Sequence, residues 1–96
     1  MAAVPPGQIS FVVNGPIRRR DLAGLSARLC RLLARGNVEL ALCELRGVEA
    51  NAVAVDALAR LQLAARRRGS RLCVRGASAD LRELVSLLGL LDLLPL

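Results

Sequence analysis

The sequence contains no histidine, lysine, threonine, tyrosine or tryptophan, and Phe11 is its only aromatic residue. Without histidine, the commonest general acid–base group and the commonest nitrogen ligand of metal ions are both excluded. Without tyrosine and tryptophan, the stacking of unpaired nucleic-acid bases on aromatic side chains is nearly excluded as well. The chain therefore has few residues of the types used in catalysis, and we expect a binding function.

The sequence has three cysteines, Cys30, Cys43 and Cys73. Their number is odd, and no two of them have the close spacing of a metal site. Residues 1–8 lack the basic and apolar regions of a signal peptide, and no apolar run reaches the roughly 18 residues of a membrane span. We therefore expect a cytoplasmic protein with reduced thiols and without a metal or other cofactor.

Apolar residues and arginine are what the sequence has in quantity. Hydrophobic residues make up 54% of the 96 positions, which is enough for one folded domain with a modest core. All fourteen basic residues are arginines, and eight acidic residues leave a net charge of +6. This balance fits a solvated surface, or an acidic protein, nucleic-acid or membrane partner. The cluster of Arg18, Arg19 and Arg20 opens a predicted helix, where cations are unfavourable, so it is the candidate anion contact.

Strand and helix patterns alternate along the chain. Runs of apolar residues predict strands at 8–13, 37–45 and 70–74, and apolar residues at helical spacing predict helices at 18–35, 52–68 and from 79 onward. Gly36 and Gly69 end the first two helices, and Ser78 caps the third. This order predicts a single α/β domain over residues 1–96 with a mostly parallel sheet, after a flexible lead at 1–7.

Alternation within the predicted strands indicates how the sheet is covered. One set of alternate positions is large and apolar while the other is smaller or polar, so we expect all three helices to cover the first face. The residues of that face are Ile9, Phe11, Val13, Val38, Leu40, Leu42, Leu72 and Val74.

The second set of positions predicts a half-polar face that is left open. Cys43 and Cys73 share this face, with a disulfide geometrically possible but disfavoured in a reducing compartment. Glu39 lies on it as well and could pair across the strands with Arg71 or Arg75. Such a face would meet solvent, a second protomer or further strands.

Catalytic motifs are missing from the rest of the chain. It has no glycine-rich phosphate loop, no base that could activate a cysteine nucleophile, and no paired carboxylates. The apolar residues 87–96 predict the end of the third helix and a short turn, with an exposed interaction patch as the alternative. The loop after the second strand is the expected site, because ligands and partners gather beyond the carboxyl ends of strands in α/β sheets.

Four stretches resemble a STAS domain of the compact, MlaB-like kind: LCELRGV at 42–48, NAVAVDALARL at 51–61, AARRRG with LCVRGA within 64–77, and LRELVSLLGL at 81–90. The resemblance extends over roughly residues 9–96. STAS domains are named for sulfate transporters and anti-sigma-factor antagonists of bacteria. The resemblance implies a βα superhelical fold and a non-enzymatic, regulatory role in protein–protein interaction.

In the STAS family this loop carries an Asp followed by a Ser or Thr, which an anti-sigma kinase phosphorylates to block docking. The matching positions here are Asn51 and Ala52, and no Ser, Thr, Tyr or His lies between Gly47 and Gly69. The resemblance therefore implies a degenerate phosphorylation site and a module that binds its partner through this loop and the second helix. The predicted partner-binding residues are Gly47, Val48, Glu49, Ala50, Asn51, Ala52 and Val53.

Several partners and two other functions stay open at this point. The resemblance implies an anti-sigma kinase, a sigma-regulatory protein or a component of an ABC transporter as the partner. A homodimer that pairs through its bare sheet face or edge is one alternative, because an uncovered sheet must be protected. The other is an arginine-dependent nucleic-acid or nucleotide binder, whose affinity would fall steeply with salt.

Overall fold

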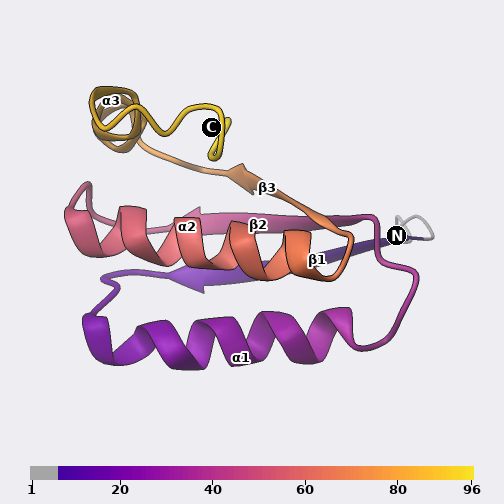
Figure 1. The fold of residues 1–96 in the computed structure, drawn as a ribbon. Coiled ribbons are helices and arrows are strands. Elements are labelled where there is room, and N and C mark those ends of the chain that lie inside the picture. Colours follow the sequence, from indigo (N-terminus) through magenta and orange to yellow (C-terminus); the bar gives the residue numbers. More distant parts are fainter. Residues whose placement is uncertain (1–6) are drawn as a thin grey trace, which may run out of the picture.

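A computed structural model describes residues 7–96, so the predicted flexible lead at 1–7 lies, apart from Gly7, outside the described residues. Three parallel strands form one sheet in the order β1-β2-β3, which confirms the α/β class and the βαβαβα order (Figure 1). The elements are β1 (Gln8–Asn14), the 3-10 turn η1 (Arg19–Asp21), α1 (Leu22–Leu33), β2 (Leu40–Arg46), α2 (Ala52–Arg67), β3 (Arg71–Arg75) and α3 (Ala79–Leu87).

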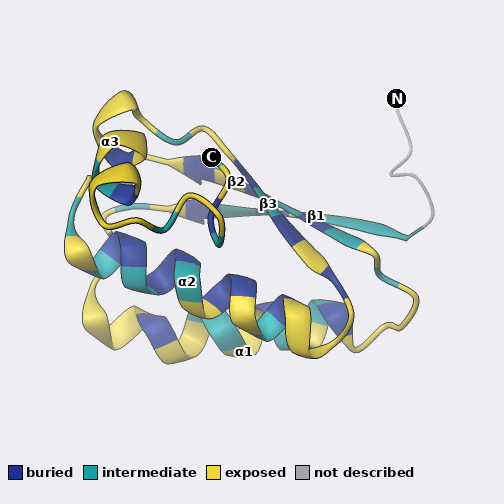
Figure 2. Ribbon diagram, turned by 45° about the horizontal axis from the view of Figure 1, so that its top comes forward, coloured by how far each residue is buried: buried dark blue, intermediate teal, exposed yellow. Residues whose placement is uncertain are grey.

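The helices gather on one face of the sheet. Right-handed crossovers between neighbouring parallel strands place α1 and α2 side by side there, and α3 lies past the carboxyl end of β3 (Figures 1 and 2). A single hydrophobic core joins alternate residues of all three strands to all three helices. Among residues 7–96 no helix covers the opposite face, and its apolar side chains are only partly buried (Figure 2).

The predicted orientation of the second strand was wrong. Ala41 and Cys43 are fully buried toward the helices, whereas Leu40 and Leu42 lie on the other face. The strand begins at Leu40 rather than at residue 37, and its register aligns Cys43 with Phe11 and with Val74. Residues aligned across a parallel sheet share one face, so Cys43 faces the helices as Phe11 and Val74 do.

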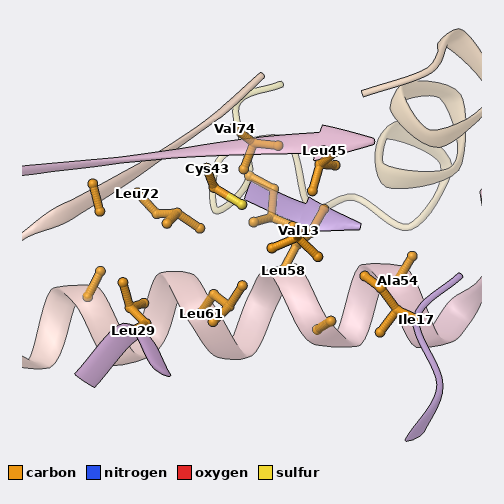
Figure 3. Packing of buried hydrophobic residues seen from close by; sticks show 14 of the residues in the cluster. Val13, Ile17, Leu29, Cys43, Leu45, Ala54, Leu58, Leu61, Leu72 and Val74 are labelled. Carbon is orange, nitrogen blue, oxygen red and sulfur yellow. The ribbon is translucent and has the colours of Figure 1, made fainter. Parts of the chain in front are cut away.

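Packing under α2 explains why small residues face inward on the central strand. Leu58 and Leu61 of α2 are fully buried and point toward the sheet, as Figure 3 shows. Ala41 and Cys43 leave the volume that these leucine side chains fill, and Leu40 or Leu42 in their place would overfill it. Larger apolar residues were expected on the buried face of each strand. This fails for β2 because the leucine side chains of α2 fill the buried volume there.

This correction separates the two cysteines of the predicted open face. Cys43 lies under the helices and Cys73 on the opposite face, and all three cysteines are free thiols. Glu39 precedes β2, where its carbonyl accepts a hydrogen bond from the Arg71 backbone N–H. In the described part of the chain its carboxylate forms no ion pair with Arg71 or Arg75, so the predicted cross-strand pair was wrong.

At each edge of the sheet one helical side chain binds the backbone of the edge strand. Gln62 of α2 is 3% exposed, and its amide accepts from the Leu72 N–H (2.9 Å) and donates to the carbonyls of Leu72 and Leu93 (3.1 Å each). At the other edge Arg28 of α1 donates to the Val12 carbonyl (2.8 Å). These contacts occupy groups that an edge strand would otherwise offer to another chain.

The residues after α3 pack in part against the core. Leu94 is fully buried, and Leu90, Leu93 and Leu96 are partly buried against the hydrophobic cluster. This agrees with the predicted turn after the third helix. The same segment leaves Leu88 (52%) and Leu91 (45%) exposed, and Leu87, the last residue of α3, is 77% exposed.

Candidate functional site

The predicted partner-binding loop lies at the carboxyl edge of the sheet, at the left in Figure 1. Parallel strands end on the same side, so the loop at 47–51 sits between the turn that follows β1 and the turn that follows β3. Within this site Gly47, Glu49, Ala50 and Ala52 are exposed, whereas Val48, Asn51 and Val53 are partly buried. The structure therefore brings the predicted residues together on an accessible loop and the first turn of α2.

Two glycines from neighbouring turns hold the backbone at this loop. The N–H of Gly15 donates to the Arg46 carbonyl (2.7 Å), and a Cβ at Gly15 would collide with the Gly47 carbonyl. On the other side a Cβ at Gly76 would lie 2.5 Å from the Leu45 carbonyl oxygen. Close backbone approach of this kind requires glycine, so the path into the loop is fixed before any partner arrives. Neither Gly15 nor Gly76 was predicted as part of the site, although each lies two residues after a predicted strand.

Asn51 has a structural role at the start of α2. Its backbone is extended, and its side-chain Oδ1 accepts a hydrogen bond from the Ala54 N–H (2.9 Å), which makes it the N-cap of the helix. Ala52 follows as the first helical residue and exposes its methyl group. At the predicted degenerate phosphorylation site, Asn51 thus caps the helix and Ala52 presents an uncharged surface.

The arginine cluster before α1 is brought to this same helix. Arg19 Nη1 lies 3.6 Å from Asp56 Oδ2, and Arg60 Nε donates to Asp56 Oδ1 (2.9 Å). Arg18 and Arg20 are exposed beside it. The loop and the cluster were predicted as separate candidates, and in the structure Asp56 of α2 links the cluster to the helix that follows the loop.

The outer face of α2 continues the surface away from the loop. Asp56, Arg60 and Leu63 follow Ala52 at helical spacing, and Leu63 is 44% exposed. A shallow groove of about 290 Å³ runs between α1 and α2 beside Leu63. Leu63 was not anticipated, although its spacing from Ala52 already placed it on the polar face of the predicted helix.

The Cys43 thiol is buried in the core, and the described residues form no cluster of metal ligands. Burial raises the pKa of the Cys43 thiol from 9.0 to about 12, and nearby Arg28 opposes this only in part. Thiolate is the reactive form of cysteine, so Cys43 is a core residue. Between residues 7 and 96, His, Cys, Asp and Glu side chains form no group of three that could hold a metal ion. None of the described helices is long and apolar enough to span a membrane.

The fold and this surface define a class: a small parallel α/β domain with its helices on one face and an exposed, prearranged loop before the second helix. A family model described as "Mlab, STAS domain" matches residues 5–95, so the chain belongs to this family of STAS domains. The family is generally non-catalytic. No curated protein and no solved structure matches the chain.

Proposed function

We propose that this protein is a non-catalytic interaction domain that binds a protein partner through the site at 47–53 and the outer face of α2. The observation that supports this best is the loop itself, which is exposed yet fixed by Gly15 and Gly76. A binding surface that is rigid before association loses less conformational entropy when the complex forms. The exposed Leu63 extends that surface with apolar area on α2.

We further propose that binding here is constitutive. The first turn of α2 carries Ala52 and Val53, and a kinase needs a hydroxyl group to transfer phosphate. Without the phosphate, no added negative charge can block docking at this loop. Regulation at this surface would then depend on the amount of either protein rather than on a modification of the loop.

For the partner we propose a cytoplasmic component of an ABC transporter, because the family model that matches is the Mlab one. An anti-sigma kinase or another sigma-regulatory protein remains the second candidate, since the family includes anti-sigma-factor antagonists. The arginines near α2 would favour an acidic contact surface on either partner.

Ala52→Glu tests the surface. A carboxylate at the exposed first position of α2 mimics the charge of a phosphate but favours the helix dipole, so the fold is kept. We expect binding to the ATPase subunit of an ABC transporter of the same organism, measured by isothermal titration calorimetry, to weaken by about a hundredfold or more. Unchanged binding by this variant would exclude the loop as the interface.

Ala27→Glu is the matched control, because Ala27 is also an exposed helical alanine but lies on α1. It should bind like the wild type. Replacing the ATPase subunit by a purified anti-sigma kinase in the same titration distinguishes the two partner classes.

A further inference from the structure

The uncovered face of the sheet combines an apolar centre with positive charge. Leu40 and Leu42 of β2 are partly exposed there, and their register places them beside Arg71 and Cys73 of β3. We call the set Val12, Leu40, Leu42, Arg71, Cys73 and Arg75 the open face. Glu44 and Arg46 lie on the same side and pair at 3.2 Å, so their charges offset each other and Arg71 and Arg75 leave the open face positive. Asp92 lines the same hollow as Arg71 at the β3 edge of this face.

The charge of the chain is segregated along its length. Thirteen of the fourteen arginines precede residue 77, whereas residues 80–92 contain three of the eight acidic residues and only Arg82 as a cation. Asp80, Glu83 and Leu87 follow one another on α3 at a spacing that aligns them along one side of the helix. Leu88 and Leu91 add exposed apolar area just beyond the helix. We call Asp80, Glu83, Leu87, Leu88 and Leu91 the leucine patch.

We propose that the open face of one molecule binds the leucine patch of a second copy. The leucine patch presents exposed apolar side chains and the open face presents partly exposed ones, and the charges beside them are opposite in sign, which favours association. Pairing of two open faces would bring arginines against arginines, and pairing of two leucine patches would bring carboxylates against carboxylates. The complementarity therefore points to a head-to-tail arrangement.

Strand-to-strand pairing is a poorer way to join two copies. Gln62 already occupies the backbone groups of Leu72 at the β3 edge, and Arg28 occupies the Val12 carbonyl at the β1 edge. A head-to-tail contact uses two different surfaces, so each copy keeps one free and association can continue into a ring or an open chain. The contact is independent of the proposed function, because it uses neither the loop at 47–53 nor the outer face of α2.

Sedimentation velocity of the wild-type protein from micromolar to millimolar concentration is the first test. The surfaces are small, so we expect weak, reversible association that grows with concentration and decreases as salt screens the charges. Two variants remove one surface each. R71E/R75E reverses the charge of the open face, and L87S/L88S makes the leucine patch polar; each should weaken association by about tenfold or more.

A mixture of the two variants is the decisive measurement. R71E/R75E keeps an intact leucine patch and L87S/L88S keeps an intact open face, so together they can form one native contact. We expect each variant alone to stay monomeric and the equimolar mixture to form dimers that grow no further. Dimer formation in the mixture also shows that both variants are folded.

Matched controls separate these surfaces from general changes of charge and polarity. R31E/R35E makes the same charge change at exposed positions at the end of α1, and Leu63→Ser removes an exposed leucine from α2. Both should associate like the wild type. The proposal is overturned if the wild type is monomeric at every concentration and salt. It is equally overturned if R71E/R75E associates normally, as in a contact between two leucine patches, or if the mixture stays monomeric.

Discussion

Gln62 is the residue whose role differs most from its appearance in the sequence. It looks like an ordinary polar residue on a helix, yet it is buried and bridges α2, β3 and the segment after α3 through three hydrogen bonds. Its amide replaces a neighbouring strand at Leu72, with one donor and one acceptor in the positions that backbone would offer. Buried polar side chains of this kind matter to stability because, without them, their buried backbone partners would have no hydrogen bond, not even to water.

Gln62→Leu should therefore destabilise the protein although it adds apolar surface to the core. It leaves the Leu72 N–H and the Leu72 and Leu93 carbonyls without partners, and we expect the free energy of unfolding to fall by about 2–3 kcal/mol. Urea denaturation followed by circular dichroism measures this. Leu63→Gln, the exposed neighbour, should change stability by less than about 0.5 kcal/mol. Equal stability of Gln62→Leu and the wild type would show that Gln62 is dispensable.

Among the structural elements, the loop before α2 depends on its neighbours more than on its own residues. Gly76 belongs to the turn after β3, has φ of +80°, and lies against the Leu45 carbonyl. Gly69 ends α2 with nearly the same φ (+75°) but has open space where a Cβ would stand. Substituting either glycine introduces the strain of a left-handed backbone, but only at Gly76 does the new side chain also clash. Comparing the two therefore measures the free-energy cost of the clash alone.

Gly76→Ala is expected to be clearly more destabilising than Gly69→Ala. Both substitutions carry the strain of a positive φ, about 1 kcal/mol, but only the first also forces a methyl group against backbone. We expect Gly76→Ala to cost about 2 kcal/mol more, in thermal or urea unfolding. If the two substitutions cost the same, the close approach of Gly76 does not fix the loop.

The stability of the whole molecule at alkaline pH follows from what the sequence lacks. The sequence has no lysine and no tyrosine, the side chains that in most proteins titrate between about pH 9 and 12. In the folded protein the pKa of Cys43 is raised from 9.0 to about 12. Above pH 9 the unfolded chain therefore loses a proton that the folded chain still holds, and unfolding becomes more favourable.

We expect the free energy of unfolding to fall by up to about 1.4 kcal/mol per pH unit between pH 9 and about 12 through Cys43. Cys43→Ala should remove most of this slope, while Cys73→Ala, a half-exposed cysteine of β3, should keep it. Urea titrations at a series of pH values measure the slopes. An unchanged slope in Cys43→Ala would show that another group controls alkaline unfolding.

The sequence by itself determined the order of strands and helices, the parallel sheet, the single covered face and the position of the loop before α2. Apolar periodicity and capping residues such as Ser78 act locally and are visible in the chain. Tertiary structure decided which face of β2 turns inward, because Leu58 and Leu61 of α2 need the space above Ala41 and Cys43. It also decided that Gln62 binds the edge backbone at Leu72 and that Arg19 reaches Asp56, since contacts between distant residues exist only after the elements have packed.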